Sequence, residues 1–144
     1  MKKFKSLLFI PGNKENMLNK AISLKPDAFI PDMEDSVPHD QKIIALELIK
    51  SELGKLAQTK IPIIPRLNAL SSKFIKNEIK NLTSDQIYGF TIGKIRTVDD
   101  IKYLDALISA EEEKKEMVPG KVKIIPWLES AEAAINAKDI ASCC

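Results

Sequence analysis

The sequence has 144 residues, of which 44% are hydrophobic and 29% charged, a composition typical of one globular domain with a sizeable core. Twenty-two Lys and Arg residues against 20 Asp and Glu leave a net charge of +2 without a dense basic block, which argues against nucleic-acid binding. One histidine and two adjacent cysteines, Cys143 and Cys144, cannot make a His/Cys zinc site or a framework disulfide, and no apolar run approaches the length of a membrane span.

The first predicted element is a strand over residues 7–10, which Pro11-Gly12 ends. The apolar run after the basic residues 1–5 is too short for a signal peptide. Because no transit peptide is visible, a cytoplasmic location is the default expectation, and a mitochondrial one stays open.

Four further strands and a series of helices follow in alternation. Apolar residues at helical spacing predict helices over residues 13–24, 40–53, 74–82 and 97–117, with a last helical segment before Cys144. Asn13 and Thr97 are candidate N-caps, and Gly54 is a candidate C-cap. The strands are short, almost wholly apolar runs over residues 28–31, 61–64, 88–92 and 122–126.

Strands that alternate with helices predict a parallel sheet, either an open doubly wound sheet or the front of an eight-stranded barrel. No GxGxxG or Walker loop follows any strand, which disfavours a nucleotide-binding sheet. Polar residues follow the carboxyl ends of four different strands, as in barrels. We therefore predict an α/β fold of the (β/α)8 TIM-barrel type, with about the first five β/α units in a single domain over residues 1–144 that is a truncated N-terminal part of the barrel.

An acid cluster, Asp32, Glu34 and Asp35, follows the second strand. Such carboxylates can bind a hard cation or hold a basic side chain, and the alternative is a helix-entry cap at Asp35 or Ser36. If the strand persisted, Asp32 and Glu34 would point one way and Asp35 the other.

Two basic side chains and two polar ones follow the later strands. Arg66, with Asn68 after it, suits bidentate capture of a substrate carboxylate, and a salt bridge to the acid cluster is compatible with that role. Lys94 suits pairing with an acid or with a substrate carboxylate. Glu129 is a candidate metal ligand, with a helix N-terminal acid as the alternative.

Four segments match a known family in order and spacing: SLLFIPGN over residues 6–13, DMEDSV over 32–37, PRLN over 65–68 and LES over 128–130, with Asn136-Ala137 behind the last. They resemble the HpcH/HpaI aldolase/citrate lyase family, in its citrate lyase β-subunit-like branch. That branch includes citryl-, malyl- and citramalyl-CoA lyases.

The resemblance implies a magnesium-assisted carbon–carbon lyase that cleaves a 3-hydroxy-dicarboxyl- or tricarboxyl-thioester into an acyl-thioester and an oxo-acid. By the same resemblance, Arg66 binds the oxo-acid carboxylate with Asn68 and Lys94 beside it, and Glu129 is the first magnesium ligand. Arg66, Glu34 and Asp35 are the catalytic residues that the resemblance implies, and Asp32 supports them. The partners implied are acyl-CoA or an acyl-carrier thioester and an oxo-acid, with a homotrimer or hexamer as the assembly.

Two departures from the family pattern are visible. Gly93 precedes Lys94 where the family often has proline, and the family's second metal carboxylate, an aspartate, would lie beyond Cys144. We therefore expect the chain alone to be inactive and to bind magnesium poorly. Two alternatives stay open: a truncated, non-catalytic binding or assembly module, and an acyl-CoA thioesterase on the same scaffold.

Overall fold

The strands of the sheet lie side by side in chain order. The computed structural model describes residues 3–143, and its five parallel strands are arranged β1-β2-β3-β4-β5. Their bounds are β1 Leu7–Pro11, β2 Ala28–Asp32, β3 Arg66–Leu67, β4 Gly89–Ile92 and β5 Lys123–Pro126. A doubly wound sheet reverses its strand order at a switch point, whereas a barrel adds each strand next to the last. The observed order is that of a barrel, which confirms the predicted fold class.

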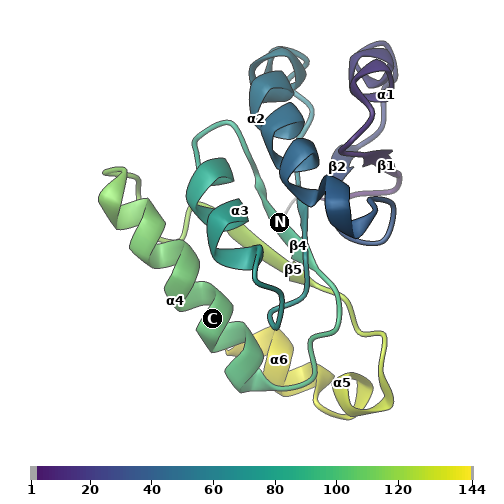
Figure 1. The fold of residues 1–144 in the computed structure, drawn as a ribbon. Coiled ribbons are helices and arrows are strands. Elements are labelled where there is room, and N and C mark those ends of the chain that lie inside the picture. The colour runs from purple at the N-terminus through teal and green to yellow at the C-terminus, as the bar shows by residue number, and fades with distance from the viewer. Residues whose placement is uncertain (1–2, 144) are drawn as a thin grey trace.

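The longer helices form one layer on one face of this sheet (Figure 1). Neighbours in the series α1 to α4 contact one another in turn, and α6 packs against α4. The bounds are α1 Glu15–Ala21, the short 3₁₀ helix η1 His39–Gln41, α2 Lys42–Gln58, α3 Ile75–Leu82, α4 Val98–Lys114, α5 Ala131–Ile135 and α6 Ala137–Ser142. None of the helices in residues 3–143 is both long and apolar enough to cross a membrane.

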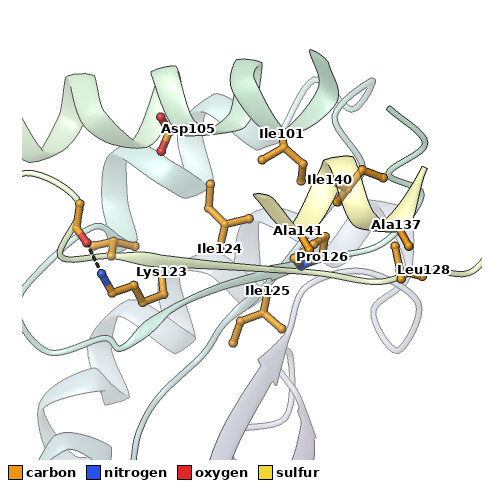
Figure 2. A pocket seen from close by; sticks show the side chains of 12 residues that line it. Ile101, Asp105, Lys123, Ile124, Ile125, Pro126, Leu128, Ala137, Ile140 and Ala141 are labelled. Carbon is orange, nitrogen blue, oxygen red and sulfur yellow. Dashed lines mark hydrogen bonds between the residues drawn. The ribbon is translucent and has the colours of Figure 1, made fainter. Parts of the chain in front are cut away.

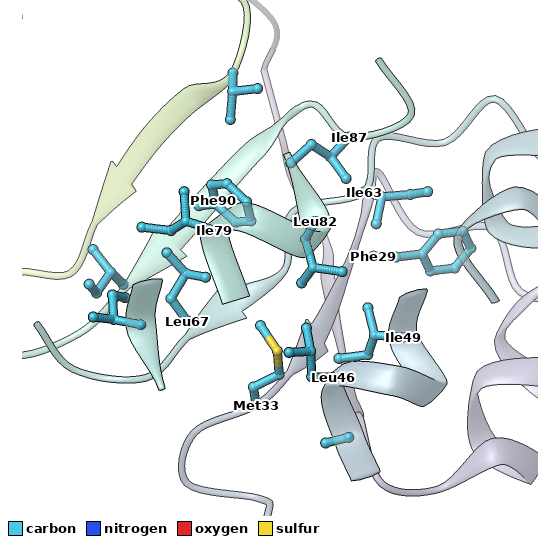
Figure 3. Packing of buried hydrophobic residues seen from close by; sticks show 14 of the residues in the cluster. Phe29, Met33, Leu46, Ile49, Ile63, Leu67, Ile79, Leu82, Ile87 and Phe90 are labelled. Carbon is cyan, nitrogen blue, oxygen red and sulfur yellow. The ribbon is translucent and has the colours of Figure 1, made fainter. Parts of the chain in front are cut away.

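Side chains of the strands alternate between two apolar clusters. The larger cluster fills the space between the sheet and its helices, where Phe29 and Ile63 of the strand region meet Leu46 and Ile49 of α2 (Figure 3). The smaller cluster lies on the opposite face of the sheet and is formed by Ala28, Ile30 and Ile64, with Phe4, Tyr88 and Ile125 against it. A sheet that buries apolar side chains on both faces explains why its strands read as continuous apolar runs.

The sheet is strongly curved, because aromatic rings from its two outermost strands meet. Phe9 of β1 and Trp127, just after β5, are in edge-to-face contact with ring centroids 5.5 Å apart. In a flat sheet, four strand spacings of about 4.8 Å would place these strands roughly 19 Å apart. The concave face is therefore the interior of a partly formed barrel, and the helices cover its convex outside.

The third strand differs most from its prediction. It was expected over residues 61–64, but the regular ladder covers only Arg66–Leu67, with an isolated bridge between Phe29 and Ile63. Pro62 and Pro65 have no N–H to donate, and they interrupt the ladder on this segment. As a result, Arg66 lies within the strand and not behind it.

Helix boundaries differ at two predicted caps and agree at a third. Helix α2 runs through Gly54 to Gln58, so the predicted C-cap there is wrong. Asn13 does not cap α1; its Nδ2 donates to Gln41 Oε1. Thr97 does cap α4, in a reciprocal capping box with Asp100. Of the two adjacent cysteines, Cys144 lies outside the described residues.

Two glycines give a matched test of this fold. A Cβ at Gly89 would lie 2.2 Å from the carbonyl oxygen of Lys123 in β5, whereas a Cβ at Gly54 in α2 meets nothing closer than 3.8 Å. Gly89→Ala should lower the free energy of unfolding by about 1–3 kcal/mol or more, because β4 and β5 must separate. Gly54→Ala should raise it by about 0.4–1 kcal/mol, because alanine restricts the unfolded chain and favours helix. Urea unfolding followed by circular dichroism measures both, and equal losses in the two variants would contradict the assigned environments.

Candidate functional site

The carboxyl end of β2 turns sharply, and Asp32 shapes that turn. Its Oδ1 accepts a hydrogen bond from Glu34 N–H at 2.8 Å, and its Oδ2 accepts one from Ser36 N–H at 3.2 Å. Because the strand ends at Asp32, the alternation expected for Asp35 does not apply. Glu34 and Asp35 instead point at the same neighbour.

That neighbour is Arg66, whose position beside Asp32 follows from the pairing of β2 with β3. Its Nη2 forms an ion pair with Glu34 and a hydrogen bond of 2.7 Å with Asp35, and its Nη1 lies 3.7 Å from Asp32. Arg66 is only 6% exposed. Burial opposes its positive charge, but the three carboxylates outweigh that effect and raise the pKa of Arg66.

The guanidinium of Arg66 retains an unused donor. Within the described residues, its buried Nε has no hydrogen-bond partner. On the barrel-interior side, the ring of Trp127 lies 4.8 Å from Cζ, which is within cation–π distance. A buried N–H without a partner is costly in a folded protein, and the fold of residues 3–143 leaves this cost uncompensated.

Lys94 connects Glu129 with the turn that carries Asp32, Glu34 and Asp35, which we call the acid turn. Its Nζ lies 2.9 Å from Glu34 Oε1, and this pairing raises the pKa of Lys94. Its backbone N–H donates to Glu129 Oε1 at 2.6 Å. Lys94 adopts φ +60°, the left-handed region, and such backbone strain is concentrated at functional sites.

Gly93 permits this approach of Glu129. A Cβ at position 93 would lie 2.7 Å from Glu129 Oε1, so the carboxylate occupies space that any larger residue would fill. The glycine that departs from the family pattern is therefore matched to the observed position of the glutamate.

The structure thus brings together Asp32, Glu34, Asp35, Arg66, Lys94 and Glu129, which we call the strand-end cluster. Asn68 lies apart from it: its Nδ2 and backbone N–H both donate to Glu78 of α3. Burial raises the pKa of Glu78, and the hydrogen bonds from Asn68 oppose that shift. The functional roles assigned to these residues from the sequence stay predictions.

Lys42 is a residue that the sequence analysis missed. From the start of α2, its Nζ donates to the backbone carbonyls of Met33 and Glu34, at 2.7 and 2.5 Å. Burial lowers the pKa of Lys42, and the nearby carboxylates, Asp32 first, oppose that shift. The sequence does contain a signal for the burial of Lys42, because residue 42 shares the helical spacing of the buried residues Ala45, Leu46 and Ile49.

A cavity of about 910 Å³ opens beside the strand-end cluster. Its walls come from the loops that follow β2, β3, β4 and β5 and from the start of α4, and they include Asp35, Ser71, Lys94, Arg96, Tyr103 and Glu129. A smaller groove of about 610 Å³ lies elsewhere, between β5, α4 and α6 (Figure 2). Ile101 and Ile140 line that groove, and Ile124 points into it while Ile125 points to the other face of the sheet. The polar cavity, with its charged walls, is the candidate site.

The described residues do not by themselves make a magnesium site. No group of three or more His, Cys, Asp or Glu side chains within residues 3–143 is arranged to hold a metal ion. Glu129 offers a carboxylate at the cavity wall, but one of its oxygens already accepts from Lys94 N–H. Magnesium in proteins needs near-octahedral oxygen coordination. Further ligands would have to come from outside this set.

Residues 5–144 match the family model described as HpcH/HpaI aldolase/citrate lyase. The chain belongs to this family. Its curated relatives include a (3S)-malyl-CoA thioesterase of Cereibacter sphaeroides, 30% identical over 139 residues, and the citrate lyase subunit beta of Leuconostoc mesenteroides, 28% identical over 138 residues. Each alignment covers 96% of this chain but only 45% and 46% of those relatives, so the chain spans about half their length.

Solved structures agree on the fold. Haloferax volcanii malate synthase, as a lead(II) complex, superposes with a TM-score of 0.84 at 21% identity, over 97% of this chain and 45% of that one. The citrate lyase beta subunit of M. tuberculosis, complexed with oxaloacetate and magnesium, gives 0.69 at 20% identity, over 95% and 52%. At these identities the comparison establishes the α/β barrel architecture of this chain and nothing further.

Lys42 provides a test of how the acid turn is held. Lys42→Met removes the donor to two buried carbonyls, and each carbonyl left unsatisfied should cost about 1–3 kcal/mol of unfolding free energy. Lys50 lies on the same helix but pairs with Asn81 at an exposed position, so Lys50→Met should stay within about 0.5 kcal/mol. Urea unfolding of both variants gives the comparison. A Lys42→Met protein as stable as Lys50→Met would show that the acid turn does not depend on this ammonium.

Proposed function

We propose that this chain carries the oxo-acid end of a carbon–carbon lyase. In the whole protein, the reaction would cleave a citryl-, malyl- or citramalyl-type thioester into an acyl-thioester and an oxo-acid, with coenzyme A or a carrier protein as the thiol. Family membership supports the lyase class. The observation that supports the oxo-acid role is the arrangement of carboxylates around Arg66.

Two of these carboxylates hold Arg66 in different ways. Both acids pair with Nη2, but Glu34 is 5% exposed, whereas the side chain of Asp35 is 66% exposed and lines the cavity. A substrate carboxylate can replace Asp35 on Nη2, since both are anions of the same geometry. Arg66 would then keep Glu34 as its fixed partner and exchange an exposed carboxylate for the ligand.

The proposed chemistry fits the charge of this site. Cleavage breaks the carbon–carbon bond, turns the substrate hydroxyl into a carbonyl by loss of its proton, and leaves the bonding pair on the thioester enolate. Arg66 would hold the carboxylate next to the new carbonyl and fix its orientation. The Nζ of Lys94, at the cavity wall, would add a positive charge beside the developing oxo-acid.

Magnesium enters this proposal only as a requirement of the whole protein. Glu129 would supply one oxygen ligand, and the remaining ligands would come from residues outside 3–143. Assembly into a homo-oligomer is likewise proposed for the whole protein and not for this chain.

Binding of the oxo-acid can be measured on this chain through its single tryptophan, Trp127, because its ring lies against Arg66. Glyoxylate or pyruvate should change the Trp127 fluorescence at saturation. Arg66→Lys keeps the buried charge but loses the planar fork, and should weaken binding about tenfold or more. Asp35→Asn should tighten binding, because it removes the competing anion.

Arg96 supplies the matched control for this titration. Arg96 lines the cavity, but its side chain is 67% exposed and its one ion pair, with Glu132, is long at 3.9 Å. Arg96→Lys should therefore bind the oxo-acids as the unsubstituted chain does. Unchanged affinity in Arg66→Lys, or no fluorescence response in any form of the chain, would rule out Arg66 as the oxo-acid site.

A thioesterase is the second candidate, because one relative is named a (3S)-malyl-CoA thioesterase. The two activities differ in products, and an assay of the whole protein separates them. A lyase acting on malyl-CoA should release glyoxylate and acetyl-CoA without free thiol, whereas a thioesterase releases malate and one free thiol per turnover. We expect glyoxylate, and thiol release without glyoxylate would favour the thioesterase.

A further inference from the structure

Trp127 occupies the barrel interior directly beside the proposed carboxylate site. It follows β5, and its ring centroid is 4.8 Å from Arg66 Cζ. A cation at this distance from an indole face is attracted by the ring quadrupole, and the attraction grows when water is excluded. Arg66 is buried, so its guanidinium meets these conditions.

The indole is itself held in place by a hydrogen-bonded chain. Its Nε1–H donates to Thr91 Oγ1 at 2.5 Å, and Thr91 Oγ1 donates to the carbonyl oxygen of Ile125 at 2.8 Å. Thr91 lies in β4 and is paired in register with both Arg66 and Ile125. The ring orientation is therefore tied to β3, β4 and β5, three of the four strands whose ends carry the strand-end cluster.

The guanidinium of Arg66 has ionic contacts with carboxylates and one contact with an aromatic ring. The acid turn binds Nη2 and approaches Nη1, the ring of Trp127 lies close to Cζ, and Nε has no partner within the described residues. The acids supply charge and bind the Nη edge of the group, and none of these contacts covers the face of the guanidinium at Cζ. The indole ring of Trp127 lies over that face and restricts the movement of the guanidinium out of its plane.

We propose that Trp127, with Thr91 behind it, is a positioning residue for Arg66 that sets the orientation in which the guanidinium receives the oxo-acid. This inference rests on the proposed function, since it assumes that Arg66 binds a carboxylate. Trp127 acts through Arg66 and not on the reacting atoms. Thr91 acts one step further away, by orienting the indole.

The test measures carboxylate binding by nuclear magnetic resonance, without the use of tryptophan fluorescence. The chain has two arginines, Arg66 and Arg96, so the Arg66 Nε–H resonance can be assigned with an Arg96→Lys sample. Titration with glyoxylate should shift this resonance and yield a dissociation constant. Trp127→Leu should raise that constant about fivefold to thirtyfold. Trp127→Phe, which keeps a ring face, should restore most of the affinity, and Thr91→Val should give an intermediate value.

Phe4 provides the matched control. It makes an edge-to-face contact with Tyr88 at 5.5 Å and 86°, the same geometry as the Phe9–Trp127 contact at 5.5 Å and 83°. Phe4→Leu should therefore cost stability without a change in glyoxylate affinity. A purely structural role for Trp127 would make Trp127→Leu behave like Phe4→Leu in both measurements.

The outcomes separate this inference from the function on which it rests. If the unsubstituted chain binds glyoxylate and the Trp127 and Thr91 variants bind within twofold of it, the positioning role is wrong and the oxo-acid site stands. If the Arg66 resonance does not respond to glyoxylate in the unsubstituted chain, both are overturned. Should Trp127→Leu fail to fold, Trp127→Phe and Thr91→Val decide the question, because both retain an aromatic ring in the barrel interior.

Discussion

A buried guanidinium needs carboxylates around it, and the arrangement of this chain follows from that requirement at Arg66. An uncompensated charge in the interior costs several kcal/mol, so the ion pairs at the ends of β2 and β3 have to form together. The parallel pairing of these strands supplies the register, and the turn at Asp32 brings Glu34 and Asp35 to the guanidinium. Folding and the candidate site therefore depend on the same contacts.

The helices take part in this arrangement from outside the barrel. Lys42 of α2 binds the backbone of the acid turn, and Glu78 of α3 binds Asn68 two residues after Arg66. Both side chains are buried and ionisable, and each forms hydrogen bonds with the backbone of a loop at the strand ends. Arg66 is thus placed by the strands, by the ring of Trp127 and by the helices, which leaves the exposed Asp35 as its most replaceable partner.

The sequence was sufficient for the sheet and for most of the strand-end cluster. An apolar run that ends in Pro11-Gly12 locates β1, apolar runs followed by polar residues locate β2, β4 and β5, and parallel strands necessarily bring their ends to one edge. It was insufficient where a tertiary contact overrides a local signal. The two prolines shorten β3, Gly54 lies inside a helix whose buried face continues past it, and Asn68 binds Glu78 on α3. The roles of Lys42 and Trp127 depend on which face of an element meets which neighbour, and this follows only from the packed structure.

The contact between Phe9 and Trp127 joins two residues that are far apart in the sequence. During synthesis at about 5–20 residues per second, β1 emerges several seconds before the tryptophan does. For that interval Phe9 has no ring to pack against, and the curvature of the sheet cannot be completed. The aromatic contact that completes the curvature of this sheet therefore forms late in synthesis. A nascent chain that stops short of β5 would expose the side chain of Phe9 on an incompletely curved sheet.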